Sequence, residues 1–136
     1  MAVVKELLRA ESDGTIGFGD YTLAEKSKLE DFKHAGDLLK VKTFREITRL
    51  EKNGMVLYES VPGTAVTEFA ETENGVSFKV EGPEDAQITV GLAEDTAYRV
   101  RVGGEDVGMI KTNLGGKLAF SAQLAGAGEV AVEISR

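Results

Sequence analysis

Adjacent carboxylates are the residues of this sequence most suited to chemistry. Three such pairs, Glu84-Asp85, Glu94-Asp95 and Glu105-Asp106, each lie in a predicted connection between strands. In an up-and-down meander the first and third connections lie at one end of the sheet. Their side chains could meet there and bind Ca²⁺, through Glu84, Asp85, Glu105 and Asp106. The spacing of an EF-hand loop is absent, however, and acidic turns also discourage edge-to-edge pairing. We therefore expect no metal or cofactor, with Ca²⁺ as the alternative.

Nucleophilic catalysis has few residues to use in this chain. The sequence contains one histidine, His34, and no cysteine, which excludes thiolate nucleophiles and Cys-ligated zinc. A Ser/His/Asp arrangement would depend on His34 alone, and this residue precedes a predicted turn at Ala35-Gly36, where an exposed polar side chain is usual. The 23 acidic residues offer many pairs for glycoside hydrolysis, but their separation is a property of the folded chain. We expect a protein that is not an enzyme.

The net charge of −7 is carried mainly by the second half of the chain. Residues 1–60 contain 10 basic and 11 acidic side chains, whereas residues 61–136 contain 6 and 12. Because phosphate backbones and anionic lipids repel an acidic surface, nucleic acids and membranes are poor partners. The first half carries a basic stripe, formed by Lys40, Lys42, Arg45, Arg49 and Lys52. We interpret it as a solvated face or as a contact for the acidic half of another copy, which salt would weaken.

Period-two alternation of apolar and polar residues indicates the elements that must position these side chains. It is clearest after residue 76 and is typical of half-buried antiparallel strands. Turn residues such as Asp13-Gly14 and Asn53-Gly54 separate the strands, of which we expect roughly ten or eleven. Residues 23–34 are either helical or extended, and the lack of a clean apolar stripe of helical period favours an extended segment.

The expected fold is all-β and antiparallel in two parts. An N-terminal β-rich region, residues 1–81, packs on a small C-terminal β-sandwich, residues 82–136, and the boundary lies at the junction around Pro83. The strand at residues 55–58 is apolar on both parities, so we expect a second sheet or another copy to cover its second face. With no visible signal peptide and no apolar run of ~18 residues, the expected location is cytoplasmic, with signal-independent export left open.

Segments 98–102, 116–120 and 130–134 share a regular strand spacing, with turn glycines between them. In this pattern the last third of the chain resembles the small Ig-like β-sandwich modules of bacterial polysaccharide-processing enzymes. It implies a sandwich and an accessory role at a glycan. Such modules usually bind sugars through exposed Trp or Tyr. This chain has no Trp, and its three tyrosines, Tyr21, Tyr58 and Tyr98, lie in apolar strand patterns.

Segments 40–48, 58–66 and 81–87 read KVKTFREIT, YESVPGTAV and EGPEDAQ. Through these segments the whole chain is similar to a group of short proteins from anaerobic Gram-positive bacteria that often carry the label endosialidase. A sialidase needs an arginine cluster for the sialic carboxylate, and only five arginines precede the C-terminal residue. The chain is also too short for a propeller fold. The resemblance therefore implies kinship of sequence without the sialidase mechanism.

These observations together predict a non-enzymatic structural or interaction protein that forms homo-oligomers. The missing catalytic motifs, the doubly apolar strand and the uneven charge support this reading. The residues expected at the interface are Met55, Val56, Leu57, Tyr58, Lys40, Lys42, Arg45 and Arg49. The alternative function is a glycan-associated accessory or binding module.

Overall fold

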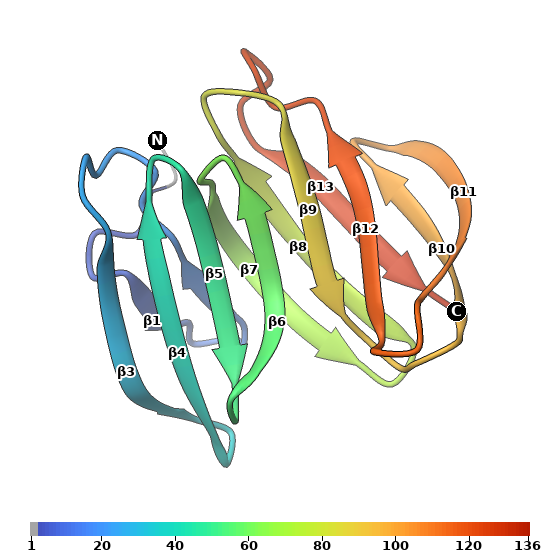
Figure 1. Ribbon diagram of the computed structural model, residues 1–136, viewed down its shortest axis with the longest axis horizontal. Coiled ribbons are helices and arrows are strands. Elements are labelled where there is room, and N and C mark those ends of the chain that lie inside the picture. The colour runs from blue at the N-terminus through green and yellow to red at the C-terminus, as the bar shows by residue number, and fades with distance from the viewer. Residues whose placement is uncertain (1–2) are drawn as a thin grey trace.

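The computed structural model describes residues 3–136 and consists of strands joined by turns and loops (Figure 1). No helix occurs among these residues, so no described segment is a helix long and apolar enough to cross a membrane. The strands are β1 (Leu8–Ala10), β2 (Ile16–Phe18), β3 (Ser27–His34), β4 (Asp37–Phe44), β5 (Ile47–Lys52), β6 (Met55–Val61), β7 (Ala65–Thr72), β8 (Gly75–Glu81), β9 (Ala86–Gly91), β10 (Ala97–Val102), β11 (Glu105–Lys111), β12 (Lys117–Ala122) and β13 (Val130–Ser135). The predicted all-β fold is confirmed.

The strands form two antiparallel sheets that pack face to face. The front sheet of Figure 1 has the order β12-β9-β6-β5-β4-β3, and the back sheet has the order β1-β2-β7-β8-β13-β10-β11. Strands from both sides of residue 82 therefore contribute to each sheet. β9 pairs with β6 in the front sheet, and β13 pairs with β8 in the back sheet. The segments 1–81 and 82–136 both contribute strands to each sheet, and the division of the chain into these two regions stays a prediction.

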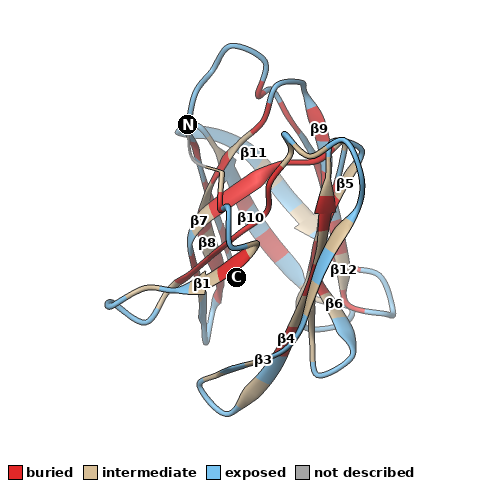
Figure 2. Cartoon of the chain, turned by 90° about the vertical axis from the view of Figure 1, so that its left-hand side faces the viewer, coloured by how far each residue is buried: buried red, intermediate tan, exposed pale blue. Residues whose placement is uncertain are grey.

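The core lies between the sheets, because alternate residues of most strands are buried, and Figure 2 shows buried residues in red on strands of both sheets. β8, β9, β12 and β13 keep this alternation without interruption, as their period-two patterns predict. Four aromatic rings meet at the centre, and the Phe18 ring lies 5.2 Å from that of Tyr58 in an edge-to-face contact. Phe69 and Phe78 complete the cluster. Such contacts stabilise the fold beyond the burial of their apolar area.

Residues 23–34 are extended, as the missing helical stripe indicates, and form β3 from Ser27 to His34. The pairing of β3 with β4 shifts register between Leu29 and Phe32, and Asp31 has a positive φ of 57° there. This β-bulge explains the irregular apolar pattern of the segment, because the extra residue changes the face that each later side chain occupies. The expected ten or eleven strands fall short of the described thirteen, in part because β1 and β2 have only three residues each.

A second bulge corrects the expected environment of residues 55–58. In β6, Tyr58 pairs with Leu50 and Val56 pairs with Glu51, so Leu57 is an extra residue on its strand. Neighbouring residues at such a bulge can point to the same face. Leu57 and Tyr58 are accordingly both buried, with exposed fractions of 8% and 0%, while Met55 is 68% exposed. The bulge thus explains why two neighbouring apolar residues of β6 both face the core, and the interface expected at residues 55–58 stays a prediction.

Candidate functional site

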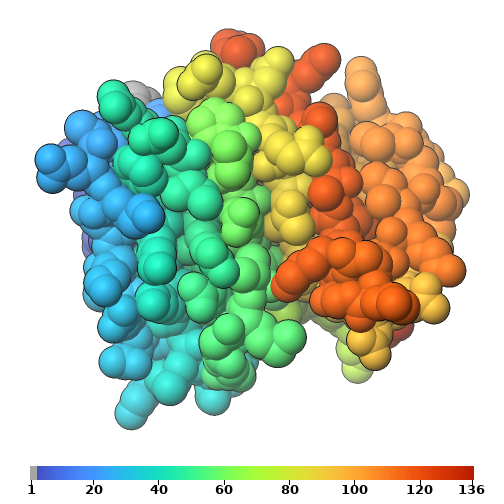
Figure 3. Space-filling model, in the orientation of Figure 1, coloured from blue at the N-terminus to red at the C-terminus, as the bar shows by residue number. Residues whose placement is uncertain are grey.

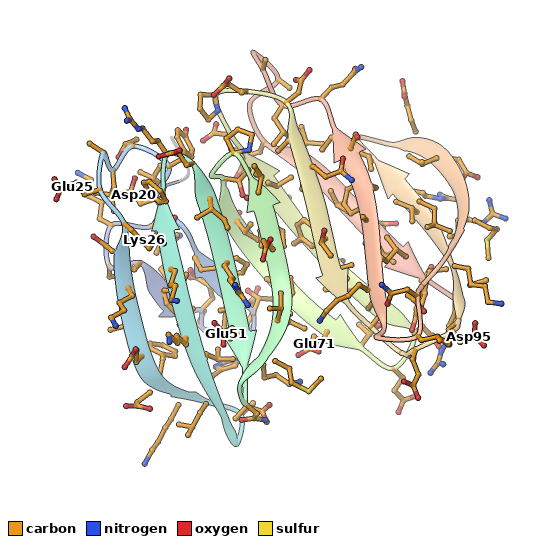
Figure 4. The ribbon with its side chains drawn as sticks, in the orientation of Figure 1. Asp20, Glu25, Lys26, Glu51, Glu71 and Asp95 are labelled. Carbon is orange, nitrogen blue, oxygen red and sulfur yellow. The ribbon has the colours of Figure 1, made fainter. Side chains whose placement is uncertain are left out.

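The acidic pairs lie in loops and hairpins that do not form the predicted meander. β8 and β9 belong to different sheets, and so do β9 and β10, so the first two acidic connections cross between sheets. Figure 4 shows Asp95 at the lower end of the molecule. No group of three or more acidic, histidine or cysteine residues in the described part of the chain is arranged to hold a metal ion. The four candidates Glu84, Asp85, Glu105 and Asp106 are thus not gathered into one site.

Two of these carboxylates instead accept hydrogen bonds from backbone amides. Asp85 Oδ1 accepts hydrogen bonds from the amides of Leu124 and Ala125 at 3.0 and 3.1 Å, which ties the β8–β9 connection to the loop after β12. Asp106 Oδ1 accepts the amide of Gly108 at 2.9 Å, and its Oδ2 lies 2.6 Å from Arg99 Nη1. The Gly108 amide and then Arg99 hold the pKa of Asp106 below its usual range. Both residues therefore have structural partners.

The basic stripe lies on β4, β5 and the turn between them, and much of its charge is compensated within the chain. Lys40 Nζ lies 3.3 Å from Glu30 of the neighbouring strand β3. Arg49 Nε lies 3.7 Å from Glu51 and 3.8 Å from Glu59. No ion pair of Lys42 or Arg45 occurs among the described residues. With its charge partly neutralised by carboxylates, the stripe is a weaker attractant for an acidic surface than the sequence alone suggests.

The tyrosines are poorly placed for stacking on a sugar. Tyr58 and Tyr98 are 0% and 3% exposed, and the Tyr98 hydroxyl accepts a hydrogen bond from the Ala93 amide at 3.2 Å. Tyr21 is partly exposed, and its hydroxyl lies 3.4 Å from Glu81 Oε1. Burial, followed by the charge of Glu81, raises the pKa of Tyr21. Only Tyr21 presents part of its ring to solvent.

A groove opens between the two sheets at the lower end of the molecule. One cavity of about 400 Å³ lies between the ends of β6 and β12, where the space-filling view is hollowed between the green and orange segments (Figure 3). A second cavity of about 370 Å³ includes His34 and Asp13. Lys52, Leu57 and Glu71 line both cavities. The imidazole of His34 makes no ion pair with a carboxylate within the described chain.

Charged side chains bridge this groove. Lys52 of β5 in the front sheet lies 3.0 Å from Glu71 of β7 in the back sheet, and Figure 4 shows Glu71 in the space below the two sheets. Lys117 of β12 reaches past β9 and donates to the Val56 carbonyl at 3.0 Å. Gly91 permits that crossing, because a Cβ at this position would lie 2.5 Å from the Val56 oxygen. Polar bridges over an apolar floor are typical of a small-ligand groove.

A fully buried network of hydroxyl groups is the feature that sequence reasoning missed. Thr48 Oγ1 lies 2.7 Å from the Thr64 carbonyl, 3.0 Å from the Thr64 amide and 2.9 Å from Thr43 Oγ1. Tyr58 and Ser60 each contact Thr64 Oγ1 at 2.8 Å. Burial raises the pKa of Tyr58. Polar residues at inward positions of β4, β5 and β6 are the only signal that could have revealed it.

Four strands form the edges of the sheets, and they differ in how well they are protected against pairing with another chain. β1 is short, and β3 carries a bulge and four charged side chains. β11 has a bulge next to Gly108, whose φ is +108°. β12 pairs with β9 over six residues without any shift of register. It therefore lacks a bulge, one of the usual devices that protect an edge strand.

No protein-family model, curated protein or solved structure matches this chain.

Proposed function

We propose that this chain is a non-enzymatic interaction protein that associates with copies of itself. The observation that carries the proposal is the outer surface of β11, where Val107 and Met109 are 50% and 54% exposed. They stand two residues apart on the last strand of the back sheet. An apolar pair at the rim of a sheet suits an isologous contact, in which the same patch meets itself across a two-fold axis. The flexible methionine adapts to such a surface.

The carboxylates singled out by the sequence support this proposal through their roles in the fold. Asp85 caps a loop, and Asp106 orders the start of β11 directly beside Val107. Arg99, the partner of Asp106, is opposite Met109 in the ladder. The polar groups around the exposed pair thus serve to hold the strand in place, which preorganises an apolar contact.

Light scattering after size exclusion tests self-association, at about 50 mM and 500 mM salt. We expect an oligomer at micromolar concentration that persists at the higher salt, because an apolar contact is not screened. Met109→Glu should shift the protein to a monomer, whereas Met55→Glu, at a methionine that is even more exposed, should not. A wild-type monomer at both salts would refute the proposal. An oligomer that dissociates in high salt would instead assign the contact to the basic stripe.

Glycan binding is the second candidate function, and the groove between the sheets favours it. The groove offers hydrogen-bonding groups from Thr72 and Lys117 above apolar residues such as Leu57. Sugar hydroxyls require such polar groups, although an aromatic platform is not provided by Tyr58 or Tyr98. A glycan array in which wild type and Lys117→Met give the same pattern would exclude the groove as the binding site.

A further inference from the structure

The free edge of β12 presents backbone groups without a strand partner. The Lys117 amide donates to Asn113 Oδ1 at 2.9 Å, and the Lys117 carbonyl accepts the Asn113 amide at 3.1 Å, so both point away from β9. The Gly116 carbonyl accepts the Leu92 amide at 2.8 Å and points toward β9. Because these directions alternate along a strand, the amides and carbonyls of Ala119 and Ser121 point to the open edge. No described strand lies beside them.

The side chains at this edge leave the backbone accessible. Ala119 and Ser121 are small, uncharged and exposed. The only charged residue of β12 is Lys117, and its ammonium is directed over Gly91 to the Val56 carbonyl. The edge thus lacks the outward charges, prolines and bulges by which strands avoid pairing with other chains.

The back sheet extends beyond β12 and forms a shelf under the open edge. In Figure 1, β10 and β11 continue to the right of β12, the last strand of the front sheet. Val102 of β10 and Ile110 of β11 are only partly buried where they pack on the core. A strand added beside β12 would extend the front sheet over this shelf. The front sheet therefore leaves one side of the back sheet uncovered.

This shelf also determines what kind of strand fits. If a second copy paired its own β12 with this edge in antiparallel orientation, the back sheets of the two copies would lie in the same layer. Each back sheet extends beyond its β12, so the two back sheets would collide. A single extended segment has no such second layer. Its alternate residues would face Val102 and Ile110, so they should be apolar, while the residues between them face solvent.

We propose that β12 binds an extended segment of a partner protein by strand addition. The segment pairs with Ala119 and Ser121 through its backbone, and its alternate apolar side chains pack on the shelf formed by Val102 and Ile110. Backbone pairing supplies affinity and the shelf supplies specificity, as in other cases of strand addition. This interaction goes beyond self-association through β11, since it uses the edge of the opposite sheet.

Selection from a displayed library of random nine-residue peptides tests the inference, with amide hydrogen exchange as the second readout. We expect selected peptides to share apolar residues at alternate positions and to slow exchange at Ala119 and Ser121. Ala119→Pro removes the amide that the peptide needs, while the fold retains its ladder because that amide faces the open edge. Its affinity should fall about tenfold or more. Ala119→Thr keeps the amide and should bind like wild type.

Three results would overturn the inference. The first is a library that yields no binder to the wild-type protein. The second is a set of binders that recognise Ala119→Pro as well as wild type, with Ala119→Pro shown to be folded by its thermal transition. The third is protection of the Ala119 and Ser121 amides from exchange in the absence of peptide, with a protection that grows as the protein concentration rises. This result would mean that a second copy occupies the edge. The Met109→Glu variant separates the two proposals, since it should leave peptide binding unchanged.

Discussion

Replacement of Thr48 by valine should destabilise the protein more than any other single hydroxyl deletion in the buried network. A hydroxyl has one proton, and Thr48 Oγ1 donates it to the Thr64 carbonyl at 2.7 Å. Thr48 Oγ1 must therefore accept from its two other neighbours, the Thr64 amide and the Thr43 hydroxyl. The Thr43 oxygen in turn accepts the Asp20 amide at 2.9 Å. One side-chain oxygen thus satisfies three buried groups.

The magnitude follows from the number of groups left without a partner. Valine has nearly the shape of threonine, so the packing is retained and the cost is electrostatic. Each buried group that loses its hydrogen bond costs about 1–3 kcal/mol. With three such groups, the free energy of unfolding should fall by about 3 kcal/mol or more. That is a large part of the total stability of a small protein, about 5–15 kcal/mol.

Urea unfolding followed by circular dichroism measures this loss, with an unchanged m-value as the check that the unfolding transition is comparable. Two variants are matched controls. Tyr58→Phe leaves Thr64 Oγ1 paired with Ser60 at 2.8 Å and should cost only about 1 kcal/mol. Thr89→Val makes the same chemical change on a partly exposed position of β9 and should stay within about 0.5 kcal/mol. If Thr48→Val cost no more than Tyr58→Phe, the proposed direction of the network would be incorrect.

Three further predictions concern turns and loops. Gly75→Ala should lower the melting temperature severely and Gly104→Ala only mildly. A Cβ at Gly75 would lie 1.9 Å from the Ile134 carbonyl oxygen, whereas a Cβ at Gly104 would have no atom within 4 Å. Equal shifts of the melting temperature would contradict the packing of β8 on β13. Asp85→Ala should increase amide exchange at Leu124 and Ala125, whose amides bind its carboxylate, and Glu84→Ala should serve as an unaffected control. NMR titration should give Asp106 a pKa below the ordinary value, raised by Arg99→Ala. The contribution of Asp106 to stability is therefore present above the ordinary aspartate pKa and is lost as the pH falls through the lowered one; a pKa unchanged in Arg99→Ala would exclude the ion pair.

The all-β fold could be predicted from the sequence because alternation reports which face of a strand is buried. β8, β9, β12 and β13 alternate without a bulge, and their patterns were read correctly. Residues 55–58 were misread because a bulge adds one residue to β6, so that Leu57 and Tyr58 are both buried. A bulge changes the phase of the pattern without any change in composition, and no residue type marks it reliably.

The candidate sites could be predicted less well, because they depend on which strands are neighbours. The acidic pairs were placed in a meander, yet β8 and β9 lie in different sheets. Lys40 and Arg49 look like free cations in the sequence, and their partners Glu30 and Glu59 come from adjacent strands. The open edge of β12 depends on strand order as well, since only the complete topology shows that no described strand pairs with the side of β12 opposite β9.

The position of β13 has a consequence for how the protein is made. This strand lies between β8 and β10 in the middle of the back sheet, yet it is the last of the described strands along the chain. During synthesis on the ribosome, β7 and β8 emerge long before the strand that joins them to β10. Until residues 130–135 leave the exit tunnel, the edge of β8 that pairs with β13 has no permanent neighbour and the back sheet remains in two pieces. Such late, distant pairing slows folding and exposes nascent chains to aggregation. Chaperone binding to ribosome-bound chains should therefore persist until β13 has emerged.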